Sequence, residues 1–112
     1  MDCIFCSIVK GEIPSKKVYE DEYVYAFHDI NPMAPVHVII VPKIHIESAN
    51  AITAENSIYM AKLFEAVPKI AAILGLENGY RLISNVGPDG CQSVLHLHVH
   101  ILGGKKLSEK LD

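Results

Sequence analysis

The sequence predicts an α+β domain, in which a few antiparallel strands pack with one short N-terminal helix and one long helix. Apolar residues recur at helical spacing near the N-terminus and again over residues 53–75, and these two patterns predict the helices. Short β-branched or alternating segments, bounded by turn residues, predict the strands. The chain has 112 residues, half of them hydrophobic, which fits one globular domain over residues 1–112.

The N-terminal part of the chain is expected to form a short helix, a hairpin and a buried strand. Residues 3–10 predict the helix, which ends at Gly11, since their apolar residues have near-helical spacing: Ile4, Phe5, Ile8 and Val9. Residues 16–20 and 23–28 predict a hairpin around a polar turn at 21–22. Residues 29–35 contain two prolines, which exclude regular structure, and the β-branched segment 37–42 predicts a buried strand.

A long helix is expected to begin near Thr53 as its N-cap, with Glu55 in the first turn, and to end at Gly75. Pro68 removes a backbone donor inside this helix and is expected to kink it. Spacings of three and four residues predict one buried stripe: Met60, Leu63, Phe64, Val67, Ile70, Ala71 and Leu74.

Residues 80–85 and 94–102 predict two further strands, separated by the loop VGPDGCQS. The second of them, VLHLHVHIL, alternates apolar residues with His96, His98 and His100. Alternate side chains of a strand point to the same face, so the three imidazoles are expected to share one face. The opposite face is expected to join the core: Leu95, Leu97, Val99 and Ile101.

Charge and composition exclude several classes of protein. The net charge is −3 and the ten basic residues are scattered, so nucleic-acid binding is not expected. No apolar run approaches the roughly 20 residues of a membrane span, and the acidic N-terminus is unlike a secretory signal, so no membrane partner is expected. Three cysteines, an odd number, favour a reducing compartment over a disulfide scaffold, and we expect a cytoplasmic protein.

Three interpretations of the histidine segment compete. The imidazoles are solvated or satisfied by hydrogen bonds, or they share a metal ion, or one attacks a substrate while its neighbours orient it and bind an anion. The preceding loop favours phosphate chemistry, since Gly87, Gly90 and residues 91–93 can turn N–H groups and a hydroxyl toward one point, with Asn85 adding an amide. A neutral imidazole is a good nucleophile at phosphorus near pH 7.

The segment His96-Leu97-His98-Val99-His100, followed by Ile101-Leu102-Gly103-Gly104, resembles the motif of the histidine triad (HIT) superfamily. Its surroundings resemble the Hint branch, the purine nucleoside phosphoramidate hydrolases, of the bacterial type with a Cys-x-x-Cys. CIFCSIVKGEIPSKKVYED, FHDINPMAPVHVIIVPKIHI and LGLENGYRLISNVGPDGCQSVLHLHVHILGG carry the resemblance. It covers residues 3–104, leaves 105–112 as a short tail, and implies a HIT fold with an antiparallel sheet of about five strands.

The resemblance implies hydrolysis of the P–N bond of purine nucleoside 5′-phosphoramidates, of the adenosine 5′-monophosphoramidase type, through a nucleotidyl-histidine intermediate. It nominates His98 as the nucleophile, His37 and His100 as its supporting and phosphate-contacting histidines, and Ser93 as a phosphate or leaving-group contact. Asp29 is placed on the ribose hydroxyls, where a carboxylate accepts two hydrogen bonds. The nucleotide-binding set implied in this way is Ile4, Phe5, Ile8, Phe27, Asp29, Ile30, Asn85, Cys91, Gln92, Ser93, His98 and His100.

Cys3 and Cys6 form a Cys-x-x-Cys, which by itself is redox-active, metal-binding or incidental. A helical turn brings sulfurs at i and i+3 to one side. With His45 and His96 they make a complete Cys2His2 set for zinc. Similarity to the bacterial Hint-like proteins implies a structural zinc ion at these four residues and no organic cofactor.

The chain differs from the family pattern in its tail and at Cys91. The chain contains no tryptophan, whereas many Hint proteins carry one in a longer tail that reaches the partner subunit, so the preferred leaving group is left open. Cys91 stands where relatives often have glycine, and His28 has no assigned role and is expected at the surface. The family implies a homodimer. The alternatives are a dinucleoside polyphosphate hydrolase or nucleotidyl transferase, and a nucleotide- or zinc-binding adaptor without turnover.

Overall fold

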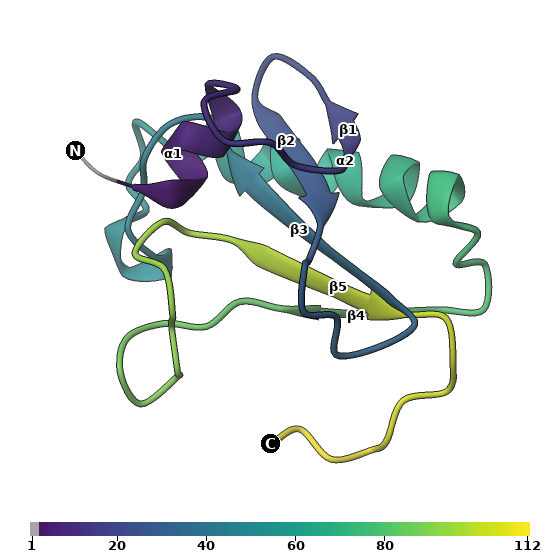
Figure 1. Ribbon diagram of the computed structural model, residues 1–112. Helices are drawn as coiled ribbons and strands as arrows, with labels where there is room; N and C mark the ends of the chain where they lie inside the picture. The colour runs from purple at the N-terminus through teal and green to yellow at the C-terminus, as the bar shows by residue number, and fades with distance from the viewer. Residues whose placement is uncertain (1–2) are drawn as a thin grey trace.

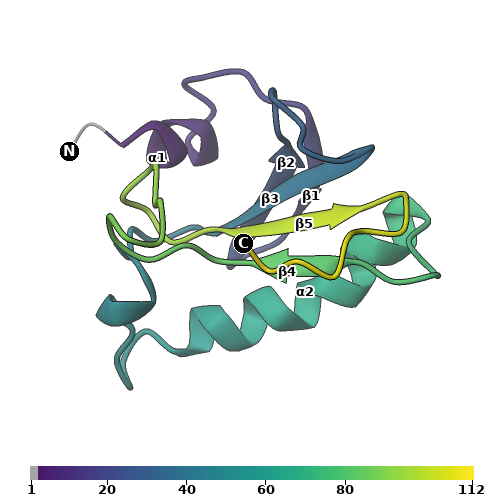
Figure 2. The ribbon, with the colours of Figure 1, turned by 90° about the horizontal axis from the view of Figure 1, so that it is seen from below.

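A computed structural model describes residues 3–112, which form one sheet with a helix on each face (Figures 1 and 2). The elements follow the order α1 (Ile4–Val9), β1 (Lys17–Glu20), β2 (Val24–His28), β3 (Val36–Pro42), the 3-10 turn η1 (Ala49–Ala51), α2 (Ile58–Leu74), β4 (Arg81–Ile83) and β5 (Val99–Gly103). The five strands are ordered β1-β2-β3-β5-β4 and every neighbouring pair is antiparallel. The expected α+β fold with a five-stranded antiparallel sheet is confirmed.

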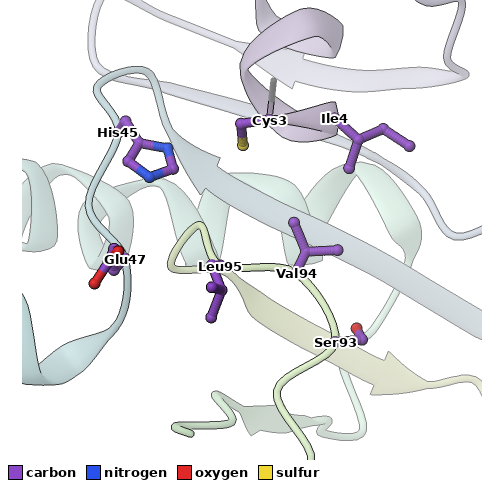
Figure 3. A pocket seen from close by; sticks show the side chains of 7 residues that line it. All are labelled: Cys3, Ile4, His45, Glu47, Ser93, Val94 and Leu95. Atoms are coloured by element: carbon purple, nitrogen blue, oxygen red, sulfur yellow. The ribbon is translucent and has the colours of Figure 1, made fainter. Parts of the chain in front are cut away.

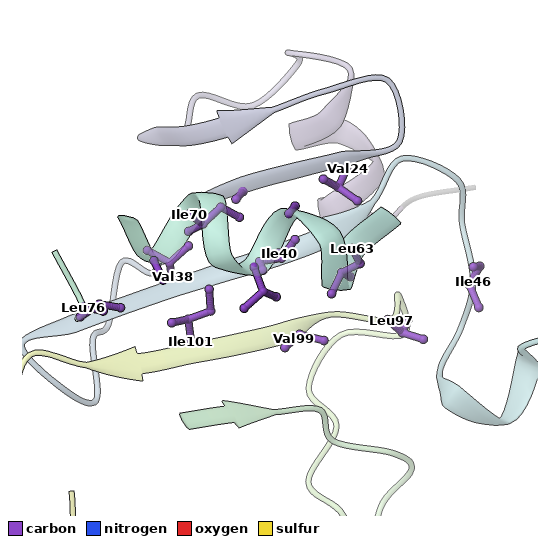
Figure 4. Packing of buried hydrophobic residues seen from close by; sticks show 14 residues of the cluster. Val24, Val38, Ile40, Ile46, Leu63, Ile70, Leu76, Leu97, Val99 and Ile101 are labelled. Atoms are coloured by element: carbon purple, nitrogen blue, oxygen red, sulfur yellow. The ribbon is translucent and has the colours of Figure 1, made fainter. Parts of the chain in front are cut away.

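The long helix α2 covers one face of the sheet and supplies most of the core (Figure 4). Leu63, Val67 and Ile70 pack from α2 against Val38 of β3 and Ile101 of β5. All five side chains are less than 5% exposed, and burying such side chains stabilises the fold by about 1.5–3 kcal/mol each. Gly75 ends the helix in the left-handed conformation, with φ of 70°, as the sequence predicted.

The start and the apolar stripe of α2 differ from the sequence prediction. The helix begins at Ile58, one turn after Thr53, and Glu55 lies before it. Thr53 and Asn56 close a separate turn, because the Asn56 side chain accepts from Thr53 N at 2.7 Å and Thr53 Oγ1 accepts from Asn56 N at 3.3 Å. Phe64 was expected in the core but is 55% exposed, since it lies at the edge of the buried stripe.

The short helix α1 covers the opposite face of the sheet (Figure 2). Phe5 and Ile8 of α1 pack against Phe27 of β2 and against Ile39 and Val41 of β3. The sheet therefore lies between α1 and α2. Packing of α1 in this second, smaller cluster places the N-terminal cysteines near the histidines. None of the helices within residues 3–112 is long and apolar enough to span a lipid bilayer.

Candidate functional site

The histidines lie on the α1 side of the sheet. His37 is on β3 and His100 on β5, two strands that pair directly. The strand predicted over residues 94–102 begins only at Val99, so His96 and His98 precede it. The reason is that its partner β3 ends at Pro42, and the earlier segment is instead held by Leu97 N, which donates to Ile46 O. Alternation nevertheless holds, because His96 and His98 are 0% and 3% exposed on one side while Leu97 packs on the other.

Leu95 does not follow this alternation. It was expected in the core but is 61% exposed. The position lies outside the paired part of the segment, where no neighbouring strand fixes which way the side chain points.

Backbone carbonyls fix the orientation of two of these imidazoles. His98 Nδ1 lies 2.7 Å from the carbonyl oxygen of His96, and His96 Nε2 lies 3.0 Å from that of Pro42. A carbonyl oxygen only accepts hydrogen bonds, so each of these ring nitrogens carries a proton. In the neutral form of each ring, the lone pair is therefore on the other nitrogen, Nε2 of His98 and Nδ1 of His96.

His37 and His100 form a second pair. His37 Nε2 lies 2.8 Å from His100 Nδ1, and Asp29 Oδ2 lies 3.4 Å from the same His37 nitrogen. Burial lowers the pKa of His37 below its usual 6.5 despite the nearby Asp29 carboxylate. Burial, with the neighbouring His98 and His37, lowers the pKa of His100 to about 4. Both rings are therefore neutral near pH 7.

Helix α1 brings an aromatic ring against the histidines. The Phe5 ring meets the His98 ring edge-on, with centroids 5.0 Å apart and an interplanar angle of 82°. It also contacts Phe27 and His96 in the same edge-on manner. Of the five residues expected to wall a purine pocket, Phe5, Ile8 and Phe27 are buried together, whereas Ile4 and Ile30 are 50% and 91% exposed.

Side-chain amides brace the loop before the histidines. Asn85 Nδ2 donates to Gly90 O at 2.6 Å. Gln92 Oε1 accepts from Gly87 N at 3.0 Å, while its Nε2 donates to Glu47 O at 2.6 Å and to Val94 O at 3.0 Å. Both side-chain N–H groups of Gln92 are thus used within the protein, so its side chain ties the loop to the segment that follows His45. The backbone N–H groups of Cys91 and Gln92 donate to Pro88 O and Gly87 O, so the expected convergence of N–H groups from Gly87, Cys91 and Gln92 on one point was wrong: these groups close the turn instead.

Two residues at the tip of this loop have restricted backbones. A Cβ at Gly90 would lie 2.5 Å from Val86 O, which requires glycine at this position. Cys91 is exposed and has a φ of 58°, the left-handed conformation that favours glycine. Glycine is therefore the less strained residue at this position. The neighbouring Ser93 is exposed beside the segment that carries the histidines.

Four metal-binding side chains meet at the end of α1. Ligand atoms of Cys3, Cys6, His45 and His96 all lie within 4.8 Å of one another. Nδ1 of His96 is 3.4 Å from Cys3 Sγ and 3.5 Å from Cys6 Sγ, and Cys6 Sγ is 3.4 Å from Nδ1 of His45. A tetrahedral zinc ion separates sulfur and nitrogen ligands by about 3.6 Å, as its bond lengths require. The donor set and the free lone pair on His96 Nδ1 therefore fit zinc.

A cavity of about 450 Å³ opens next to this cluster (Figure 3). Cys3 and His45 face it from one side and Ser93 from the other, with apolar side chains between them. The full lining is Cys3, Ile4, His45, Glu47, Ser93, Val94 and Leu95. The cavity therefore joins the metal-binding cluster to the loop that precedes the histidines.

The structure also shows contacts that sequence reasoning missed. Met33 N donates to His37 Nδ1 at 3.0 Å, Pro42 O accepts from His96, and Ser84 Oγ donates to His98 O at 2.9 Å. Two of these three groups belong to the backbone, which no side-chain motif reveals. His28, without an assigned role, is exposed as expected.

Comparison with known proteins identifies the family. The sequence model of the HIT domain family matches residues 10–107 of this chain. The chain belongs to the HIT family. The "14 kDa zinc-binding protein" of Zea mays is 47% identical over 94% of this chain and 84% of its own.

Solved HIT structures share the fold. The HIT family hydrolase from Clostridium thermocellum has a TM-score of 0.95 at 48% identity, covering 98% of this chain and 96% of its own. The histidine triad nucleotide-binding protein from Candida albicans has a TM-score of 0.81 at 35% identity, covering 99% and 87%. The resemblance inferred from the sequence is confirmed, and this HIT protein carries the Cys-x-x-Cys at Cys3 and Cys6.

Proposed function

We propose that this HIT protein hydrolyses the P–N bond of purine nucleoside 5′-phosphoramidates, with His98 as the nucleophile. The hydrogen bond from His98 Nδ1 to the His96 carbonyl oxygen carries the proposal, because it leaves the Nε2 lone pair free to attack. A hydrolase and a nucleotide-binding protein among the similar structures support a nucleotide substrate.

The reaction consists of two displacements. In the first, the His98 Nε2 lone pair forms a bond to the α-phosphorus while the P–N bond breaks, and the amine leaves with a proton that solvent supplies through the Ser93 hydroxyl. In the second, water attacks the nucleotidyl-His98, the bond from phosphorus to Nε2 breaks, and the proton of the water passes to solvent. One water is consumed, and a nucleoside monophosphate and an amine are released. Covalent catalysis divides one difficult step into two easier ones.

The remaining site residues bind the nucleotide in this proposal. His100, held by His37, contacts the phosphate together with Ser93. Asn85, Cys91 and Gln92 belong to the nucleotide-binding set because they form and brace the loop that positions Ser93. Asp29, whose side chain is 17% exposed, accepts hydrogen bonds from the ribose hydroxyls. The apolar surface for the purine is Ile4, Phe5, Ile8, Phe27 and Ile30.

We also propose that Cys3, Cys6, His45 and His96 hold a structural zinc ion. Such an ion supplies four bonds that tie α1 to the segment carrying the nucleophile. The sulfur–nitrogen distances and the zinc-binding relative from Zea mays support it. Within residues 3–112 the cysteines form no disulfide, and such cysteines stay reduced in the cytoplasm, where we propose that the protein is located.

A homodimer is the proposed assembly. Phe64 and Ile73 of α2, and Tyr80 after the helix, are exposed hydrophobic side chains that a second copy would cover. Light scattering during size-exclusion chromatography tests this directly. A mass of about 25 kDa, twice the 12.3 kDa of the chain, supports the dimer, and a mass of one chain overturns it.

Turnover of adenosine 5′-phosphoramidate tests the proposed activity. We expect the wild type and the matched control His28→Ala, which alters an exposed histidine of β2, to release AMP, and His98→Ala to release none. Faster cleavage of a diadenosine polyphosphate would move the assignment to that class of hydrolase. A folded wild type that binds AMP without turning over either substrate would identify an adaptor.

A further inference from the structure

The backbone amide of Met33 faces a ring nitrogen of His37. Met33 N lies 3.0 Å from His37 Nδ1, and an amide N–H only donates. His37 Nδ1 is therefore the acceptor and holds a lone pair. The proton of the neutral His37 ring is consequently on Nε2.

The tautomer of His37 in turn determines the tautomer of His100. His37 Nε2 lies 2.8 Å from His100 Nδ1, so the His37 proton is donated to His100 and His100 Nδ1 accepts it. The proton of the neutral His100 ring is then on Nε2. Asp29 Oδ2, at 3.4 Å from His37 Nε2, is a second acceptor for the same proton and favours the same tautomer. The Met33 amide and the Asp29 carboxylate thus act on opposite nitrogens of His37 and favour the same tautomers of two imidazoles.

The loop of residues 29–35 holds the Met33 amide in place. Asp29 N donates to His37 O at 3.0 Å, and Asp29 Oδ1 accepts from Asn31 N at 2.8 Å, so the loop is tied to β3 at its first residue. His37 is only 5% exposed, which leaves little access for water to replace the amide. The Met33 side chain is 79% exposed, so the contribution to the site comes from its backbone.

We propose that the Met33 amide is a positioning group that makes His100 present an Nε2–H donor toward the phosphate. With the opposite tautomer, His100 would instead turn a lone pair toward a negatively charged oxygen, which disfavours binding of the transition state. The kinetic consequence depends on the proposed phosphoramidase activity. The tautomers themselves do not, and they can be measured without substrate.

The experiment uses the full-length protein labelled with ¹⁵N at the histidine rings. In the wild type we expect NMR to show His37 and His100 as Nε2–H tautomers and His98 as the Nδ1–H tautomer. A His37 ring protonated at Nδ1 would overturn the proposal without any variant. Incorporating the α-hydroxy analogue of methionine at residue 33 then replaces this one N–H by an ester oxygen. The α-hydroxy analogue of alanine at residue 34, which puts an ester at the next peptide bond, is the matched control.

We expect the ester at residue 33 to give mixed tautomers at His37 and His100. It should lower kcat by about 10- to 100-fold, by analogy with the loss of the outer hydrogen-bond partner of a metal-binding histidine. KM should change little, and the ester at residue 34 should leave the ring signals unchanged. Unaltered tautomers with the ester at residue 33, in folded protein, would contradict the proposal. Altered tautomers in a protein without phosphoramidase activity would uphold the positioning role and reject only the proposed function.

Discussion

His98 and His96 are linked through the main chain: the His98 ring donates to the carbonyl oxygen of His96 across 2.7 Å, while the His96 ring turns toward Cys3 and Cys6. The same residue that completes the metal-binding cluster therefore orients the nucleophile with its backbone. Alternation of side chains alone would place the three histidines in one row. The hydrogen bonds instead give each ring a different partner: Pro42 for His96, the His96 carbonyl for His98, and His37 for His100.

Removal of the metal is expected to destabilise the protein. Cys6→Ser should reduce bound zinc from near one equivalent to near zero, measured by elemental analysis. If free zinc exceeds its Kd by 100-fold in the wild type, the loss is about 2.7 kcal/mol, which lowers Tm by about 10 °C in a domain of this size. Cys91→Ser is the control for zinc content, since Cys91 lies outside the cluster. Equal zinc content in all three proteins would contradict the assignment.

Phe5→Leu is expected to lower kcat more than it raises KM. The Phe5 ring lies edge-on to His98 with centroids 5.0 Å apart, and such contacts contribute about 0.5–1.5 kcal/mol beyond their buried area. Leucine leaves the nucleophile less constrained. Steady-state kinetics with adenosine 5′-phosphoramidate measure the effect, and Ile58→Val, at an exposed position of α2 outside the proposed dimer surface, is the control. A change in KM alone would assign Phe5 to purine binding only.

Gln92→Ala is expected to lower stability, whereas Ser93→Ala is expected to slow turnover. Gln92 makes three hydrogen bonds to the backbone, so its loss should lower the free energy of unfolding by about 1–2 kcal/mol. Ser93 is exposed, so Ser93→Ala should leave stability unchanged while it slows turnover. Urea unfolding and turnover assays separate the two. A stable Gln92→Ala protein with impaired nucleotide binding would show that Gln92 contacts the nucleotide instead.

Acid is expected to destabilise the protein through His100. Its pKa is about 4 in the folded protein and near 6.5 when unfolded, so the unfolded chain binds the additional proton between these values. The contribution to stability is fully present above pH 6.5 and is lost as the pH falls toward 4, by up to about 3 kcal/mol. Unfolding free energies measured from pH 4 to 7 should show a shallower slope for His100→Gln. Identical slopes for both proteins would exclude this contribution.

Local patterns predicted much of the fold because the responsible forces are local. Gly75 ends α2 by its conformational freedom, and the apolar residues Leu63, Val67 and Ile70 fall on the face that the sheet covers. The predicted start of α2 was wrong. The side chains of Thr53 and Asn56 form hydrogen bonds that compete with the first helical turn, and these depend on exact geometry.

The candidate site was only partly predictable for a different reason. Side chains such as Cys3, Cys6, His45 and His96 are visible in the sequence, and the structure brings them together. The groups that select the free ring nitrogens are backbone atoms of Met33, Pro42 and His96. Every residue has such backbone atoms, so the sequence does not distinguish these three. Only the fold shows where they point.

Trapping the covalent intermediate tests the central claim most directly. Protein quenched with base during turnover of adenosine 5′-phosphoramidate and digested should yield a peptide heavier by one adenylyl group, with fragmentation placing that group on His98. The phosphorus–nitrogen bond is preserved at high pH, and His98→Ala should give no such peptide. An adenylyl group on another histidine, or turnover by His98→Ala equal to that of the wild type, would contradict the assignment of His98 as the nucleophile.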